Sequence, residues 1–426
     1  MSDLKWEQCS FPIQNGGMGL GNMGVVQDCA FAASFIGNVH SDVGSEIGIK
    51  DILSLHENGG DSGCKYVSEF YRIFRKFQLI DGQRFSTLGD FLQVGAGKLE
   101  TVQSILTVIV TDRNLAEFKK KLVNPLNHEL AFITSLQSSE AGRWLTVVPR
   151  SDEFRFHNAG YEAQLRYRLH LPVKLLVGGT VCDGCKKKVV LDKTGEHLVS
   201  GCRCFGKRTH MHNGVASTLS TIISYCGFQN IREELGCFKE ADPDNGKRPD
   251  ISVLSAPFAQ DLVVEADGRI PKLILDVQVT NVLKGTQDGV LEFMTSYMAS
   301  KPNNMANKAF AGKMSKYKRI ATDNGLSFLP IIFETTGRIH PRAVKFLESL
   351  AEHAAVVKGI KYSIVFGFIM NKLSCMFQKL IAETLNSRVN AINGRLTHAA
   401  SKQFTFSHDF VVTHERFRSR ELQRHG

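Results

Sequence analysis

The chain has 426 residues, with 52 lysines and arginines against 42 aspartates and glutamates, which gives a formal net charge of +10. This length predicts two to three domains of roughly 100–200 residues each. A content of 43% hydrophobic and 22% charged residues excludes a wholly disordered or collagen-like chain. The lack of any run of about 18 uncharged apolar residues excludes a multi-span membrane protein. The positive excess permits a polyanionic partner, above all nucleic acid.

The ten cysteines are unevenly distributed, because four of them (positions 182, 185, 202 and 204) fall within one short segment. The first seven residues contain no apolar run of the kind found in secretory signals, so we expect a chain that is not secreted. In a reducing compartment, clustered thiols favour metal binding over disulfide formation.

Four regions are predicted in chain order. Residues 1–140 are mostly helical, and residues 141–213 form a connector that contains the cysteine cluster. Residues 214–390 alternate helices and strands, and residues 391–426 form a basic tail that we expect to be loosely ordered. Mixed strands and helices predict an α/β or α+β fold, and for the whole chain, with its helical first region, we expect α+β.

In the third region, apolar positions between residues 215 and 226 share one helical face, with Asn213 as the expected N-cap and Gly227 as the stop. Runs rich in β-branched residues predict strands at 251–254, 273–279 and 326–333. Residues 341–355 predict an amphipathic helix, and the apolar stretch 362–377 predicts a buried one despite Lys372.

The cysteine cluster has the spacing of a metal site. Cys182 and Cys185 form a Cys-x-x-Cys pair, and His197 and Cys202 follow as a His-x4-Cys pair. Four thiolate and imidazole ligands suit tetrahedral structural Zn²⁺. The alternatives are a redox-active or free thiol pair, or the replacement of one ligand by a spare candidate. The spare candidates are Cys204, His210 and His212.

Two carboxylates are associated with predicted strands. Asp250 leads into the strand at 251–254, and Asp276 lies inside the apolar strand at 273–279. A carboxylate in an apolar strand is costly unless it is paired or binds metal. Two such carboxylates can converge on Mg²⁺ or Mn²⁺, with Glu234 or Glu233 as a further ligand. The alternative is that Asp250 begins a turn and Asp276 forms a salt bridge.

Basic residues occur near both predicted metal sites. Lys313 and Lys316 lie on one face of a predicted helix and would orient a nucleophile or stabilise charge on phosphate. The alternative is a solvated basic face. The residues expected to contact nucleic-acid phosphates are Lys186, Lys187, Lys188, Arg208, Lys318 and Arg319.

A series of short motifs occurs in a specific order. After the cysteine cluster come His212-Asn213, Glu233-Glu234, Arg248-Pro249-Asp250, Asp276-Val277-Gln278, Lys313-x-x-Lys316 and Glu334-x-x-Gly337. Upstream lie Gly16-Gly17-Met18-Gly19, Trp144-Leu145 and Arg166-x-Arg168. Over residues 10–360, this order resembles the C-terminal half of non-LTR retrotransposon polyproteins that carry a restriction-like endonuclease.

The resemblance implies a post-polymerase helical region, a zinc knuckle and a PD-(D/E)XK nuclease domain with a central mixed sheet. Asp250 and Asp276 would hold Mg²⁺, with the carbonyl group of Val277 nearby. Three departures are evident. The polymerase palm is absent, Gln278 stands where the motif has lysine, and Met211 stands where the family usually has arginine. Lys313 or Lys316 would therefore replace the missing lysine.

The leading hypothesis is a metal-dependent DNA endonuclease derived from a non-LTR retrotransposon. The first alternative is a catalytically inactive, zinc-containing nucleic-acid-binding protein with a nuclease-like fold. The second is a zinc-stabilised scaffold that binds protein. DNA is the expected partner, with RNA as an alternative, and a DNA substrate implies nuclear rather than cytoplasmic localisation.

Overall fold

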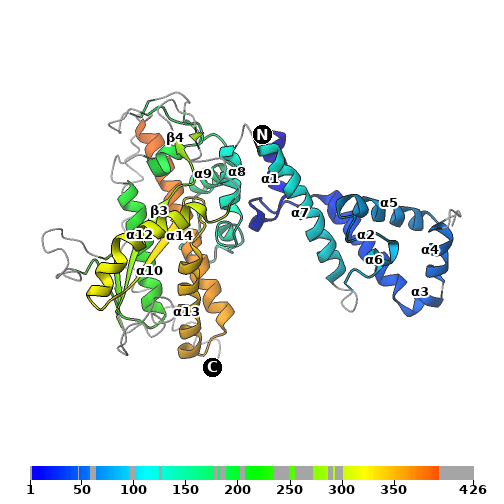
Figure 1. Cartoon of the computed structure of the whole chain (residues 1–426). Helices are drawn as coiled ribbons and strands as arrows, with labels where there is room; N and C mark the ends of the chain where they lie inside the picture. The colour runs from blue at the N-terminus through cyan, green and yellow to red at the C-terminus, as the bar shows by residue number, and fades with distance from the viewer. Residues whose placement is uncertain are drawn as a thin grey trace.

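The computed structural model is a mixed chain of helices around a small sheet (Figure 1). It describes residues 2–46, 48–57, 64–95, 101–123, 127–176, 181–182, 189–201, 207–234, 249–254, 272–285, 291–292 and 301–392. The α-helices are α1 (Asp3–Ser10), α2 (Met23–Val39), α3 (Asp42–Glu46), α4 (Ile49–Glu57), α5 (Lys65–Ile80), α6 (Leu88–Leu92), α7 (Val102–Leu122), α8 (Asn127–Leu136), α9 (Asn158–Arg168), α10 (Lys207–Tyr225), α12 (Asn304–Asp323), α13 (Pro341–Lys358) and α14 (Tyr362–Ile392). Short helical turns occur at Ile13–Asn15, Arg143–Leu145 and His197–Gly201.

The main sheet has four strands in the order β1 (Asn230–Arg232), β2 (Ile251–Val253), β3 (Leu273–Thr280) and β6 (Ser327–Glu334). The first two pairings are antiparallel, and β3 pairs with β6 in parallel. A separate antiparallel pair joins β4 (Lys284–Gly285) to β5 (Leu291–Glu292). This mixed sheet confirms the α+β class, and the three strands predicted from β-branched runs are present as β2, β3 and β6.

Side-chain alternation along β3 divides the sheet into two buried faces. Leu273, Leu275 and Val277 pack in the large core with residues of α10, α13 and α14. Ile274 instead packs with Ala321 of α12. A strand covered on both faces requires apolar residues at nearly every position. Asp276 is therefore an exception within β3 that needs a polar partner.

The long helix α14 runs through the large core, with α9, α10 and α13 packed against it. By length and composition alone it could cross a membrane, yet 56% of its most apolar window is buried inside the protein. Val365, Ile369 and Leu373 lie in the core, which confirms the buried helix predicted at 362–377.

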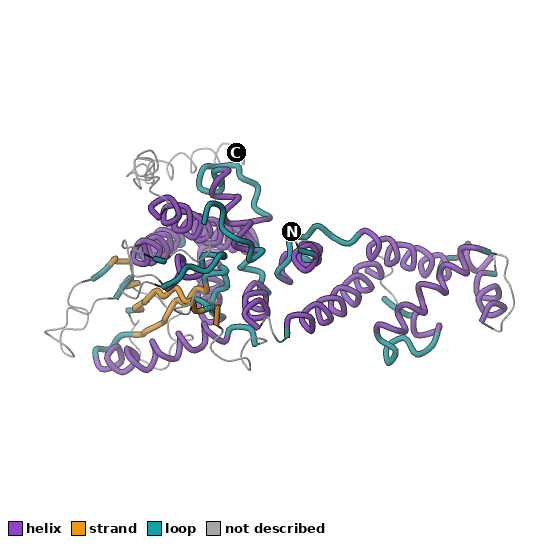
Figure 2. The backbone as a smooth tube through the Cα atoms, turned by 90° about the horizontal axis from the view of Figure 1, so that it is seen from above, coloured by secondary structure: helices purple, strands orange, loops and turns teal. Residues whose placement is uncertain are grey.

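The N-terminal helices form a second core beside the sheet-bearing body, as Figures 1 and 2 show from two directions. Residues of α2, α5 and α6 pack there around stacked rings, with the centroids of Phe35 and Phe70 4.1 Å apart. Helix α7 joins the two cores, because Leu106 lies in the small core and Phe118 in the large one. The buried Arg168 donates hydrogen bonds to the carbonyl groups of Ile13, Gly17 and Ala141, and so ties the first residues to the large body.

One local prediction was wrong. Asn213 was the expected N-cap, but α10 begins at Lys207 and Asn213 lies inside the helix. The apolar face extends further toward the N-terminus than predicted, since Met211 is buried one turn before Val215. Burial of this additional turn favours continuation of the helix through a residue that is otherwise common at caps. The predicted end at Gly227 agrees with its positive φ of 95°.

Candidate acidic site and metal-binding loop

The two aspartates lie opposite each other at the junction of β2 and β3. Ile251 pairs with Leu275 in the antiparallel register, and the backbone N–H of Asp250 donates to the carbonyl oxygen of Leu275 over 3.1 Å. The next pair in this register is Asp250 and Asp276. Side chains of directly opposed residues project from the same face of an antiparallel pair. Local strand pairing thus brings both carboxylates to one place.

The carboxylate of Asp250 is held from two sides. Its Oδ2 atom accepts hydrogen bonds from the backbone N–H of Val277 at 2.5 Å and from Nε2 of His212 at 2.9 Å. The hydrogen bond to Asp250 is the main cause of a raised pKa at His212, and burial of the ring opposes it. A neutral or charged imidazole can donate here, so this contact persists across neutral pH.

The carboxylate of Asp276 forms an ion pair with Lys313, whose Nζ lies 2.5 Å from Oδ2. Burial raises the pKa of Asp276, and the nearby Asp250 adds to this increase, whereas Lys313 and His212 oppose it. Lys313 comes from a distant helix and lies beside Asp276, and the catalytic role that the resemblance implies for it remains a prediction. The same ion pair is also what the structural alternative for Asp276 predicted.

The remaining predicted catalytic residues lie on β3, on α12 and just after β1. By strand alternation Gln278 projects from the same face as Asp276, and it is partly exposed. Lys316 is exposed, with its Nζ 4.8 Å from the ring centroid of Tyr317. Glu234 forms an ion pair with Lys272, just before β3 begins. Glu234 is therefore engaged at the opposite end of the strand from Gln278.

The predicted phosphate contacts are only partly described. Lys318 and Arg319 are exposed on α12, and Arg319 lies 3.7 Å from Asp323. Arg208 belongs to the first turn of α10, but its side chain lies outside the described part of the chain. Lys186, Lys187 and Lys188 also lie outside the described residues.

The structure describes two of the four predicted zinc ligands, Cys182 and His197. Val181 bridges to Val190, and the backbone N–H of Cys182 donates to the carbonyl oxygen of Val189 over 2.8 Å. Cys182 and His197 are both buried. Nε2 of His197 is a buried atom with no hydrogen-bond partner among the described residues. Cys185 and Cys202 lie outside them, as does the spare candidate Cys204.

A compact turn sets the position of His197. Asp192 accepts hydrogen bonds from the backbone N–H groups of Glu196 and His197, at 2.8 and 2.9 Å. Gly195 adopts a φ of 83°, and any Cβ there would contact Leu385 and a second core side chain at 2.9 Å. The turn therefore requires glycine. The buried imidazole nitrogen that it presents has no partner in the described part of the chain and is chemically suited to be a metal ligand.

Within the residues that the structure describes, no three histidine, cysteine, aspartate or glutamate side chains form a complete metal-binding group. The zinc site accordingly remains a prediction. At the acidic site, two carboxylates suit Mg²⁺, which commonly takes one or two protein carboxylates and keeps several waters. The donor set of Asp250 and Asp276 thus fits such an ion without a third side chain.

Comparisons with known proteins support one part of the predicted resemblance. No protein-family model matches the chain. Over 217 residues, the chain is 27% identical to the Retrotransposable element SLACS 132 kDa protein of Trypanosoma brucei gambiense. This similarity covers 50% of the chain and 16% of that protein. Half of the chain is therefore related to a retrotransposon protein, which supports a retrotransposon origin.

The two open candidates His210 and His212 have defined positions. His210 Nε2 lies 3.4 Å from Oε2 of Glu383, on α14. His212 contacts Asp250 instead. The sequence could not identify the partner of either histidine, because both partners are distant in the chain. On α10, residues two apart project from different faces of the helix, so the two histidines contact different partners.

Proposed function

We propose that the protein is a metal-dependent DNA endonuclease of the PD-(D/E)XK type, derived from a non-LTR retrotransposon and lacking the polymerase palm. The observation that carries the proposal is the convergence of Asp250, Asp276 and Lys313 from three separate elements. A retrotransposon origin, supported by the similarity described above, agrees with a nuclease role. Two carboxylates beside one lysine are a combination suited to hydrolysis of a phosphodiester.

Each residue has a distinct task in this proposal. Asp250 and Asp276 would hold Mg²⁺ or Mn²⁺, which when bound neutralises charge on the phosphate and lowers the pKa of water. Lys313, held 2.5 Å from Asp276, would orient the attacking water and place positive charge beside the phosphate. His212 keeps the Asp250 carboxylate oriented through its hydrogen bond. Gln278 would donate a hydrogen bond to water or phosphate.

The exposed face of α12 would contact the DNA backbone. Lys316, Lys318 and Arg319 follow Lys313 on the same helix and are exposed. Contacts from such residues to phosphates are independent of base sequence and weaken with salt. Lys186, Lys187, Lys188 and Arg208 would supply further contacts to phosphates. RNA is the alternative polyanion, and cleavage of DNA would place the protein in the nucleus.

We propose structural Zn²⁺ for the loop that carries Cys182 and His197, with Cys185 and Cys202 as the other ligands. The buried Nε2 atom of His197, which has no hydrogen-bond partner among the described residues, supports this assignment. Zinc content measured on the purified full chain tests it. One zinc per chain is expected, with loss in Cys182→Ser and in His197→Ala. Full retention of zinc by either variant would contradict the ligand assignment.

The second candidate function is a nucleic-acid-binding protein that no longer cleaves. One observation favours it: the ion pair between Asp276 and Lys313 neutralises the Asp276 carboxylate without any bound metal, as a purely structural ion pair would. Gln278, which carries no charge, occupies the position of the usual lysine. In this case DNA would bind to the basic face of α12 without hydrolysis.

Plasmid nicking with Mg²⁺ or Mn²⁺ distinguishes the two functions. Wild type should convert supercoiled to open-circular DNA, and Asp276→Ala and Lys313→Ala should each lose at least 100-fold in rate, as is typical for removal of one essential catalytic group. Asp323→Ala is the matched control, because Asp323 is an exposed α12 carboxylate away from the pair. Equal inactivity of wild type and Asp276→Ala with retained DNA binding would support the non-enzymatic alternative.

A further inference from the structure

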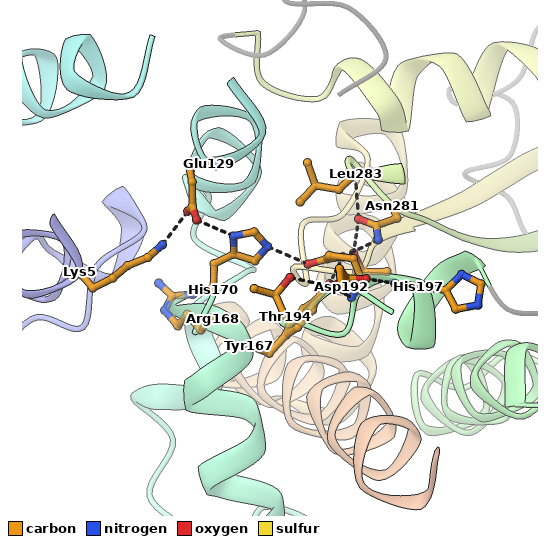
Figure 3. A network of polar contacts seen from close by, with 12 residues as sticks. Lys5, Glu129, Tyr167, Arg168, His170, Asp192, Thr194, His197, Asn281 and Leu283 are labelled. Atoms are coloured by element: carbon orange, nitrogen blue, oxygen red, sulfur yellow. Dashed lines mark hydrogen bonds and ion pairs between the residues drawn. The ribbon is translucent and has the colours of Figure 1, made fainter. Parts of the chain in front are cut away.

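A chain of buried and partly buried polar groups lies outside the acidic site and connects the N-terminal helix to the sheet (Figure 3). Lys5 of α1 pairs with Glu129 of α8, which in turn contacts Nδ1 of His170 at 2.9 Å. Nε2 of His170 lies 3.5 Å from Glu196, and Glu196 accepts a hydrogen bond from Asn281 at 2.6 Å. The last two residues are the important ones, because they connect the zinc loop to β3.

Glu196 is a fully buried carboxylate directly before His197. Oε2 accepts hydrogen bonds from the amide of Asn281 and, over 3.2 Å, from the hydroxyl group of Tyr167. Its backbone N–H is fixed by Asp192, the residue that also fixes His197. A buried carboxylate depends on every donor it has, because no water replaces a lost one. The position of the loop therefore constrains the position of Asn281.

Asn281 follows the last residue of β3, the strand that carries Asp276. Its Oδ1 atom accepts hydrogen bonds from the hydroxyl group of Thr335 and from the backbone N–H of Leu283, both at 3.1 Å. Thr335 follows β6, and its own backbone N–H donates to the carbonyl oxygen of Thr280 over 2.9 Å. One asparagine side chain thus joins the ends of both parallel strands to the loop.

We propose that Glu196 and Asn281 are positioning residues that couple the loop bearing His197 to the end of β3, so that zinc in the loop orders the strand carrying Asp276 and Gln278. This inference rests on the proposed function, since it assigns zinc a role in the geometry of the hydrolytic site. With the loop fixed by zinc, Glu196 holds Asn281, and Asn281 holds β3 against β6. Without zinc, the turn at residues 192–197 would keep only its own hydrogen bonds from Asp192, and the end of β3 would be held less firmly.

Hydrogen exchange on the full chain, with zinc bound and after chelation, tests the coupling without requiring catalysis. In wild type, removal of zinc should accelerate amide exchange in residues 273–283 by at least tenfold. Asn281→Ala should still bind one zinc, but its exchange in this segment should be fast with and without the ion. Thr335→Val, which removes the hydroxyl bonds to Asn281 and Tyr167 and keeps Asn281 itself, should reduce the effect of zinc at least threefold and serves if the alanine variant does not fold.

Asn230→Ala is the matched control, because Asn230 also joins a strand of this sheet to a helix, through Ser220 and Ser224 of α10, without contacting the loop. It should keep the full zinc effect. If the protein cleaves DNA, Asn281→Ala should lower kcat at least tenfold at unchanged KM. The proposal is overturned if wild type binds no zinc, if zinc leaves exchange in residues 273–283 unchanged, or if Asn281→Ala retains the zinc effect. Absence of cleavage with zinc-dependent exchange retained would refute the nuclease function alone.

Discussion

Replacement of His170 by asparagine should remove a pH-dependent contribution to stability. His170 has a φ of 50°, a left-handed conformation that asparagine tolerates better than most residues, so the backbone should be unchanged. The His170 side chain is 1% exposed between Glu129 and Glu196. Although burial opposes protonation, the two carboxylates raise the pKa of His170 from 6.5 to about 9. The folded protein therefore keeps an imidazolium at neutral pH.

The magnitude follows from the size of this pKa shift. At about 1.36 kcal/mol for each pKa unit, protonated His170 contributes on the order of 3 kcal/mol to folding. Because the pKa is raised in the folded state, this contribution is fully present below about pH 6.5 and is lost as the pH rises through about 9. Burial raises the pKa of Glu129, but His170 and Lys5 together lower it to about 2. The two shifts describe one interaction and are counted once.

Urea unfolding between pH 6 and pH 10 provides the assay, followed by the fluorescence of the buried Trp144 in a background in which the exposed Trp6 is replaced by phenylalanine. The difference in free energy of unfolding between the parent protein and His170→Asn should be about 3 kcal/mol at pH 6 and should fall toward zero by pH 10. The exposed His40, replaced by asparagine, is the control for loss of a histidine that lies outside this pair of carboxylates. A difference that is constant across this range would refute a buried imidazolium.

Three further predictions concern packing and charge. Arg168→Lys should lower the free energy of unfolding by about 2–4 kcal/mol, since the single ammonium nitrogen of lysine cannot reach the three carbonyl groups that Arg168 contacts from three separate nitrogens. A loss below about 1 kcal/mol in urea unfolding would contradict this. Gly337→Ala should destabilise the protein by at least about 2 kcal/mol, because φ is 98° and a Cβ would meet a core side chain. Gly312→Ala, in an open part of α12, should instead stabilise the protein by about 0.5–1 kcal/mol in the same assay. Lys316→Gln and Lys318→Gln should each reduce the slope of log affinity for DNA against log salt by about 1, and an unchanged slope would exclude α12 from the interface.

The sequence predicted those parts of the fold that depend on local pattern. Strands β2, β3 and β6 were predictable because β-branched runs mark buried strands, and the start of α13 was predictable from Pro341. The start of α10 was not predictable, because burial of Met211 is a tertiary effect that outweighs the capping preference of Asn213.

The candidate site was predictable in its residue types and not in its pairings. Asp276 could be singled out as a carboxylate within an apolar strand, but its contact with Lys313 arises only when α12 packs on the sheet. The network from Lys5 to Asn281 was missed entirely. Its charged members resemble surface residues in sequence, and Lys5 and Glu129 are separated by 124 positions. The one local signal was Glu196 beside the predicted ligand His197.

The rate of DNA nicking by wild type and by Asp276→Asn, in the same buffer with saturating Mg²⁺, tests the central claim most directly. Asparagine keeps the size of the side chain and removes the charge that would bind the metal ion. We predict cleavage by wild type and a loss of at least 100-fold in the variant, with DNA affinity unchanged. Equal rates for the two proteins, or no cleavage by wild type despite DNA binding, would contradict the assignment of Asp250, Asp276 and Lys313 as a hydrolytic site.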